Sequence, residues 1–413
     1  MRITGLITEY NPFHNGHQYH ISEALKVTGA DAAVVVMSGD FVQRGTPALM
    51  PKHLRAEIAL HCGASAVFEL PVVYACASAE SFAYGAVSLL DQLNCIDSIC
   101  FGSECGNTKI LTKIANILCQ EPLEYSLLLQ KYLKQGNSYP SARKQALKDY
   151  TGDDEILEVL DSPNNILGIE YIKAILKRKS KMKAYTISRT STGYHDTSLT
   201  SSISSATAIR NYLQETDSTS INTEPIKSAL PSYGYQLFQE NFNIRFPVWP
   251  KDLSLLLKYR LLNETRDSLT AYMDVSKDLA NRIINTRNEL IEWNQYCDIL
   301  KTKEITYSRI SRALLHIVLD IKEDMSAKVL DKNCTGYARL LAFDSGHSWV
   351  LKEMKKNSKI LVITKLSAIQ NLSPDDQKIL EKDIFASDLY ESILSTKFNR
   401  PFINEYQKKI IKK

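Results

Sequence analysis

Two histidines near the start of the chain, His14 and His17, are spaced so that both could act on one phosphate. Residues 3–7 before them form an apolar run that is too short for a helix, which predicts a buried strand. After Gly16 the apolar residues recur at helical spacing, so the pair lies where a strand gives way to a helix N-terminus. Free backbone N–H groups and the positive end of the helix dipole attract anions there. Gly16 lacks the Cβ that would keep a phosphate or ribose away from the backbone.

A second stretch, residues 204–210, combines hydroxyl side chains with an arginine at another helix start. Ser204, Ser205 and Thr207 can cap the helix and donate hydrogen bonds. Arg210 lies about one and a half turns further on and could hold an anion with its planar guanidinium group. Taken alone, this stretch is explained better by an ordinary capped helix.

Short apolar strands alternate with helices through the first half of the chain. Strands are expected at residues 31–37, 66–70, 98–101 and 183–189, and helices at residues 51–62 and 77–93. This alternation predicts right-handed crossovers and a Rossmann-like α/β fold with a parallel sheet. Ligands bind such sheets at the carboxyl ends of the strands. The loops after the first, second and fourth strands should therefore share one site.

The domain organisation follows from changes in composition. Residues 107–180 have the pattern of a helical insertion before the last strand, and the segment 216–223 is rich in serine and threonine, as linkers are. Amphipathic helices dominate the remainder. We expect a nucleotide-binding domain over residues 1–215 and a mainly α-helical C-terminal domain over residues 224–413.

Composition limits the function classes. With 413 residues and 44% hydrophobic content the chain can bury a large core, and its net charge of +4 permits a nucleic-acid partner without requiring one. No membrane span or signal peptide is evident, so we expect a cytoplasmic protein without membrane contact. The eight cysteines lack the spacing of a zinc site, and no carboxylate cage is visible, so no metal site is predicted.

The His-x-Gly-His run resembles the signature of the nucleotidylyltransferase superfamily, relatives of the class I aminoacyl-tRNA synthetases. The second stretch resembles the Ser-Ser-Thr-x-Ile-Arg motif of those proteins, with Ala206 inserted among the hydroxyl residues. Longer runs narrow the match, because residues 8–17, 37–45, 162–168, 188–189 and 193–196 are similar to the bacterial tRNA(Met) cytidine acetate ligase family. The resemblance covers residues 1 to about 215.

The resemblance implies an activity. Members of that family activate acetate with ATP as acetyl-adenylate, release pyrophosphate, and acetylate N4 of the wobble cytidine of elongator tRNA(Met). It therefore implies ATP, acetate and elongator tRNA(Met) as ligands, with Mg²⁺ accompanying ATP, and no obligate protein partner. His14 and His17 would be catalytic, donating to phosphate oxygens. The implied ATP-binding residues are Ile7, Thr8, Glu9, Tyr10, Asn11, Pro12, Phe13, His14, Asn15, Gly16, His17, Gly102, Asn165, Arg189, Ser204, Ser205, Thr207 and Arg210.

Several candidate residues have two interpretations. Asn165 could pair with ribose or adenine, or it could cap a helix. A group of polar residues after the second strand could line the same crevice or be solvated at a helix start: Asp40, Gln43, Arg44, Lys52 and Arg55. The basic runs 173–183 and 408–413, with residues 143–144 and 258–260, could follow an RNA backbone or simply be solvated surface.

Two alternative functions are considered beside the ligase. One is a small-molecule adenylyltransferase that joins AMP to a phosphorylated acceptor, which the long helical half disfavours. The other is an RNA-binding protein that keeps the nucleotide fold without turnover, which the intact pair of histidines disfavours.

Overall fold

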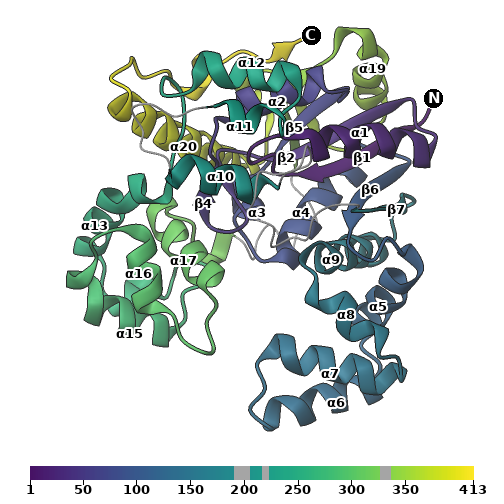
Figure 1. The fold of residues 1–413 in the computed structure, drawn as a ribbon, viewed down its shortest axis with the longest axis vertical. Coiled ribbons are helices and arrows are strands. Elements are labelled where there is room, and N and C mark those ends of the chain that lie inside the picture. The colour runs from purple at the N-terminus through teal and green to yellow at the C-terminus, as the bar shows by residue number, and fades with distance from the viewer. Residues whose placement is uncertain (190–204, 216–222, 326–335) are drawn as a thin grey trace.

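The computed structural model describes residues 1–189, 205–215, 223–325 and 336–413. An eight-stranded sheet crosses the molecule in the order β10-β8-β5-β2-β1-β6-β7, with β9 paired to β8 (Figure 1). Its strands are β1 (Ile3–Thr8), β2 (Ala32–Ser38), β5 (Ala66–Leu70), β6 (Ser98–Ser103), β7 (Lys183–Ser188), β8 (Tyr337–Phe343), β9 (Leu361–Ile363) and β10 (Ile411–Lys412). A hairpin of β3 (Phe41–Val42) and β4 (Thr46–Pro47) follows β2.

The pairing of β1 defines where a ligand can bind. β1 pairs in parallel with β2 on one side and with β6 on the other. The chain adds β5 beyond β2 and later adds β7 beyond β6, both in parallel, so the order of strands reverses at β1. Ligands of open α/β sheets bind outside the carboxyl ends of the strands at such a reversal. The predicted parallel sheet is confirmed, and the first turn lies at its switch point.

Two apolar cores cover the faces of the sheet, because neighbouring residues of a strand point to opposite faces. Ile3 and Ile7 belong to one core and Leu6 to the other. The core of Leu6 includes residues of α1 (Asn15–Thr28), α2 (Lys52–His61), α10 (Ala206–Glu215) and α12 (Ser232–Asn241). The opposite core includes residues of α3 (Val72–Ala75), α4 (Ala79–Gln92) and helices from the rest of the chain.

The expected helical insertion is present. It comprises α5 (Thr108–Gln120), α6 (Leu123–Lys134), α7 (Tyr139–Thr151), α8 (Glu155–Asp161) and α9 (Pro163–Arg178). α9 packs against α4 and α5 and so belongs to the sheet layer, whereas α6 and α7 extend away from the sheet at the bottom of Figure 1.

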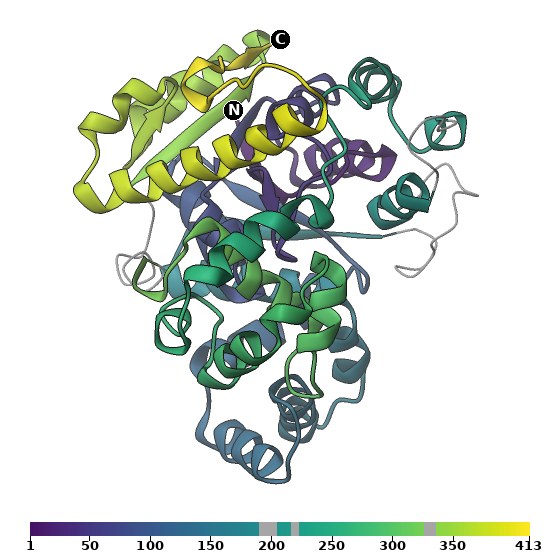
Figure 2. The ribbon, with the colours of Figure 1, turned by 90° about the vertical axis from the view of Figure 1, so that its left-hand side faces the viewer.

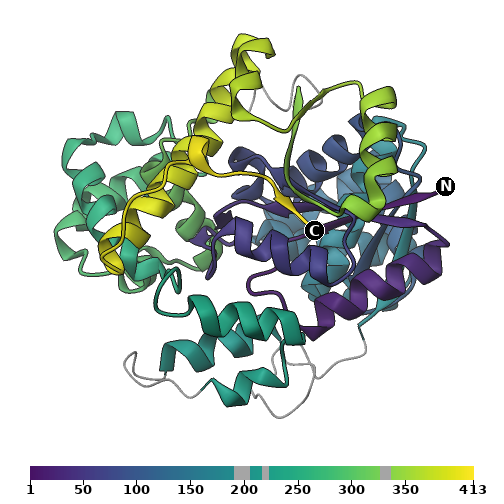
Figure 3. The same ribbon diagram turned by 90° about the horizontal axis from the view of Figure 1, so that it is seen from above.

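The C-terminal half is mainly helical, and it also completes the sheet. Its helices are α11 (Glu224–Lys227), α13 (Ser254–Asn263), α14 (Arg266–Leu269), α15 (Lys277–Thr286), α16 (Trp293–Leu300), α17 (Tyr307–Leu319), α19 (Ser348–Asn357) and α20 (Pro374–Lys397). The sequence analysis did not predict that β8 pairs antiparallel with β5 and that β9 and β10 extend this edge. Figures 2 and 3 show α20 lying across these strands and the C-terminus returning to the sheet.

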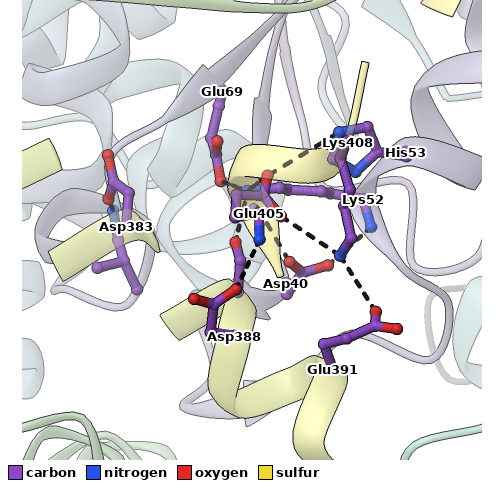
Figure 4. A network of polar contacts seen from close by, with 12 residues as sticks. Asp40, Lys52, His53, Glu69, Asp383, Asp388, Glu391, Glu405 and Lys408 are labelled. Carbon is purple, nitrogen blue, oxygen red and sulfur yellow. Dashed lines mark hydrogen bonds and ion pairs between the residues drawn. The ribbon is translucent and has the colours of Figure 1, made fainter. Parts of the chain in front are cut away.

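A buried network of charged side chains joins this edge to the first half of the chain (Figure 4). Lys52 at the start of α2 is fully buried, with its Nζ 2.6 Å from Glu69 Oε1 on β5 and 2.9 Å from Glu405 Oε1 near the C-terminus. Arg339 on β8 contacts the same two carboxylates, at 2.9 Å and 2.5 Å. Buried charges are tolerated only when they compensate one another, so these four residues depend on each other.

Replacing Lys52 by Met should lower the free energy of unfolding by about 3–5 kcal/mol, because Glu69 and Glu405 would remain buried with less compensation. Urea unfolding followed by circular dichroism measures this change. Lys26→Met is the matched control, because the side chain of Lys26 is 68% exposed and pairs only with Glu23 among the described residues. Equal urea midpoints for the two variants would contradict the role given to the network.

Candidate nucleotide-binding site

The two histidines of the first turn cap the helix that follows them. His14 is the N-cap of α1, with an extended backbone (φ −144°, ψ 173°). The Gly16 N–H donates to His14 Nδ1 at 3.0 Å, and the His14 N–H donates to His17 Nδ1 at 3.2 Å. This is a reciprocal capping box, which needs side chains at N-cap and N3. The three-residue spacing of the histidines therefore has a structural cause.

The capping hydrogen bonds determine where each ring carries its proton. A neutral imidazole has one donor and one acceptor nitrogen, and in both rings Nδ1 is used as the acceptor. The proton of each neutral ring is therefore on Nε2. The two ring centroids are 3.8 Å apart, and the rings of Tyr10 and Phe13 pack against His17 at 4.9 Å and 5.5 Å. Two N–H donors thus lie together at a helix N-terminus.

Both histidines are neutral at pH 7. Burial, together with the positive charges of Arg189 and Arg210, lowers the pKa of His14 to about 3. Burial also lowers the pKa of His17 well below its usual value, with the neighbouring His14 and Arg189 acting in the same direction. Burial lowers the pKa of Arg210 to about 10, so this group is still charged at pH 7. The site thus combines neutral donors with cationic arginines.

The second motif lies against the first turn. Arg210 Nη1 donates to the carbonyl oxygen of Asn11 at 2.5 Å, and its Nη2 donates to Thr207 Oγ1 at 3.1 Å. Ser205 Oγ accepts the Ala208 N–H at 3.1 Å at the start of α10. The structure therefore brings Arg210, Thr207 and Asn11 together. Ser204 and residues 193–196 lie outside the described residues, as does most of the 216–223 segment.

Other residues of the first turn are held by the loops around them. Ile7 and Thr8 end β1, and the Glu9 carboxylate accepts the Gln43 N–H at 2.7 Å. Asn11 Oδ1 accepts the Leu49 N–H at 2.7 Å before a cis peptide bond to Pro12. Asn15, the first residue of α1, bonds to the main chain of residues 228–229. The turn is therefore fixed from several sides.

Gly102 and Arg189 meet at the ends of β6 and β7. A Cβ on Gly102 would lie 3.3 Å from Arg189 Cγ, and the Arg189 N–H donates to the Ser103 carbonyl at 3.0 Å. The absence of a side chain at Gly102 therefore lets Arg189 lie across the end of the sheet. Arg189 also influences the pKa values of both histidines, which places it near them.

Asn165 is buried and supports the loop after β6. Its Oδ1 accepts the Cys105 N–H at 3.1 Å, and its Nδ2 donates to the Val159 carbonyl at 3.1 Å. The N-cap of α9 is Ser162, so the helix-cap interpretation of Asn165 is wrong. Glu104, which the sequence analysis did not single out, accepts the Asn165 N–H at 2.9 Å.

Lys52 and Arg55 neither line a crevice nor meet solvent, so both interpretations of them were wrong. Arg55 is fully buried and donates to the main-chain carbonyls of Glu9, Ser38, Gly39 and Met50. Buried carbonyl groups just after the ends of β1 and β2 need hydrogen-bond donors, and the Arg55 guanidinium group provides those donors.

The other polar residues expected after the second strand, Asp40, Gln43 and Arg44, have two different roles. The Asp40 carboxylate is buried and accepts the Lys52 N–H at 2.8 Å, which caps α2. Gln43 and Arg44 do line a cavity of about 530 Å³, together with Asn11 and Arg210.

The basic runs are partly neutralised. Lys173 and Lys177 pair with Glu80, and Arg178 pairs with Asp91. Arg143, Lys144 and Arg260 also lie in ion pairs, and Lys408 belongs to the buried network through Glu391 and Glu405. For Lys179, Lys181 and Lys183, which are exposed, the described residues include no ion-pair partner.

Two further observations apply to the described residues alone. No three His, Cys, Asp or Glu side chains among them come together as metal ligands. None of the helices described is long and apolar enough to cross a membrane.

The fold and the capped histidine pair define a class of nucleotide-binding proteins. The HIGH Nucleotidyl Transferase family model matches residues 1–404, so the chain belongs to that family. A tRNA(Met) cytidine acetate ligase from Alkaliphilus metalliredigens is 39% identical over 401 residues, which is 94% of each chain. The chain therefore belongs to the tRNA(Met) cytidine acetate ligase family.

Solved structures agree with this assignment. A crystal structure of Thermotoga maritima TmcAL without ligand is 32% identical to this chain, with a TM-score of 0.94 and coverage of 100% of this chain and 99% of that one. A second structure, of TmcAL bound with alpha-thio ATP, has a TM-score of 0.91 at the same identity and coverage.

Replacing His14 by Asn should change the pH dependence of stability. Asn Oδ1 can accept the Gly16 N–H as Nδ1 does, so the helix start is kept. In the wild type the unfolded chain protonates His14 near pH 6.5 and the folded chain only near pH 3, so stability is lost as pH falls below 6.5. The variant should lose about 1 kcal/mol less between pH 7 and pH 5.5. Urea unfolding at both pH values measures this, and identical losses would contradict a lowered pKa.

Proposed function

We propose that this chain is an ATP-dependent tRNA(Met) cytidine acetate ligase. It activates acetate as acetyl-adenylate and then transfers the acetyl group to N4 of the wobble cytidine of elongator tRNA(Met). The single observation that carries this proposal is the pair of neutral Nε2–H donors at the N-terminus of α1, beside Arg189 and Arg210. The names of the relatives and the ATP analogue bound by the Thermotoga maritima protein support it.

The geometry suits the activation step. An acetate oxygen forms a bond to the α-phosphorus of ATP while the bond to the pyrophosphate oxygen breaks, and negative charge spreads over the phosphate oxygens. Catalysis of such a displacement consists mostly of positioning and of stabilising that charge. His14 and His17 would donate their Nε2–H groups to the α-phosphate, and Arg189 and Arg210 would hold the departing charge.

The donor set also indicates how Mg²⁺ would take part. Apart from the Glu9 carboxylate, which accepts the Gln43 N–H, the groups assigned to this site are N–H donors and guanidinium groups, which fit phosphate oxygens. Mg²⁺ would therefore enter bound to the ATP phosphates, where it neutralises part of their charge. The hydroxyl groups of Ser205 and Thr207, at the start of α10, would lie near these phosphates.

The second step needs the acceptor RNA. The N4 amino group forms a bond to the acetyl carbon, the bond to AMP breaks, and N4 loses one proton. Residues 1–215 would supply the ATP site, and residues 224–413 would help to hold tRNA. Among the predicted basic runs, Lys179, Lys181 and Lys183 are the best candidates for backbone contact, because they are exposed and outside the ion pairs described above.

With ATP, labelled acetate and total tRNA, the protein should place label on a methionine-accepting tRNA at cytidine and release pyrophosphate. Without tRNA it should still catalyse acetate-dependent exchange of pyrophosphate into ATP. Label from acetyl-CoA but never from acetate would contradict the proposal, and transfer of AMP to a small phosphorylated acceptor would favour the adenylyltransferase.

Variants link this activity to the histidines. His14→Asn keeps the helix cap and removes the Nε2–H donor, so the exchange rate should fall roughly 100-fold to 1,000-fold. His347→Asn is the control, because His347 lies at another helix start and pairs there with Asp344. An unchanged rate in His14→Asn would mean that the first turn does not act on phosphate.

A further inference from the structure

The cavity beside the first turn connects both phosphate motifs to the helical half of the chain. Asn11 and Arg210 belong to its lining, as do the loop that contains Gln43 and Arg44, residues 248–250, and residues of α16 and α17. Figure 1 shows α10, β4 and α17 close together at this boundary. Its volume of about 530 Å³ is far larger than acetate needs and lies within the range of pockets for nucleotide-sized ligands.

One wall of the cavity is held in place by direct backbone packing. Gly45 has a φ of +76°, and a Cβ there would lie 2.3 Å from the main-chain nitrogen of Arg312 on α17. Ser311 Oγ donates to the Gly45 carbonyl at 2.8 Å, and Trp293 Nε1 donates to Ser311 Oγ at 3.1 Å. The loop after β2 therefore lies directly on α17, and the cavity between them is preformed.

The side chains of the lining match a nucleotide. Trp249 and Tyr307 contribute aromatic side chains to the lining, and unpaired bases stack on such rings. Arg44, Arg210 and Arg312 provide positive charge, although Arg312 is paired with Asp274 at 2.9 Å. None of the described residues that line the cavity is acidic. Aromatic side chains together with guanidinium groups favour a ligand that has both a planar ring and a phosphate.

One amide in the lining has a defined orientation. The Tyr307 hydroxyl donates to Asn294 Oδ1 at 3.0 Å, which leaves the Nδ2 amino group of Asn294 as the donor that the cavity can use. Cytosine carries acceptors at O2 and N3, whereas uracil carries an N–H donor at N3. A donor placed opposite N3 therefore favours cytosine over uracil, and a hydrogen bond to O2 or N3 leaves the N4 amino group free.

We propose that this cavity binds the acceptor cytidine of the RNA, unstacked from its loop. The inference rests on the proposed function and adds the place where the base is held. Because Asn11 and Arg210 belong both to the cavity and to the phosphate motifs, a base bound there lies next to an adenylate formed at the first turn.

Asn294→Asp tests this inference with the full-length protein. The Tyr307 hydroxyl can still donate to the new carboxylate, while the amide donor is lost and a negative charge faces the base. Acetylation of tRNA, measured as kcat/KM, should fall roughly 30-fold or more, the usual effect of losing a contact to a base edge. Acetate-dependent pyrophosphate exchange should stay within about twofold of wild type, because no part of ATP activation uses Asn294.

Two further variants make the result specific. Asn285→Asp introduces the same charge change on α15, where Asn285 is exposed and contacts Arg266 outside the cavity, and it should retain full acetylation. Tyr307→Phe keeps the aromatic ring and removes the hydroxyl that orients Asn294. It should weaken the preference for the cytidine-bearing tRNA over the same tRNA with uridine at that position, measured by competition binding.

Each outcome decides the inference. Normal acetylation by Asn294→Asp overturns it. Equal loss of exchange and acetylation also overturns it, because the cavity would then belong to the ATP site. Failure of the proposed function is seen in the wild type instead, as exchange without acetylation of any tRNA.

Discussion

The hydrogen bonds that His14 and His17 exchange with the first turn of α1 determine how the rest of the site can work. They use Nδ1 of both rings, which leaves both protons on Nε2, and burial keeps both rings neutral. A neutral donor needs no counter-charge when the site is empty, and it still stabilises negative charge when a phosphate arrives. The guanidinium groups of Arg189 and Arg210 supply the positive charge of the site.

This arrangement holds only if the turn after β1 has one conformation. Arg55 binds the carbonyl groups at the ends of β1 and β2, and Arg210 binds the carbonyl of Asn11. The network around Lys52 then attaches α2, which carries Arg55, to β5, β8 and the C-terminal segment. The C-terminal half therefore helps to hold the turn after β1 in place, even where it does not contact that turn.

Much of this architecture could be predicted from local sequence patterns. Alternating apolar runs and helices indicate a parallel sheet, and a strand followed by His-x-Gly-His indicates the turn. The pairing of β8 could not be predicted, because it joins segments about 270 residues apart and its run of apolar residues fits a helix equally well. Lys52 and Arg55 were misjudged because charge usually indicates exposure, and their partners come from distant strands and from the C-terminus.

The same limit applies to the cavity beside the first turn. Asn294 and Tyr307 lie in the helical half, and no local motif marks them. The contact of the loop at Gly45 with α17 helps to bring them close to the first turn and Arg210. Sequence patterns therefore indicate the turn after β1 well, whereas the cavity depends on long-range packing.

The most direct measurement is nitrogen-15 NMR of the imidazole rings of His14 and His17 at pH 7, with and without an ATP analogue. The capping hydrogen bonds predict that both rings are neutral with the proton on Nε2, and that the analogue shifts the Nε2–H signals while Nδ1 stays unprotonated. A proton on Nδ1 of either ring, or a charged imidazolium at pH 7 in the free protein, would contradict the account.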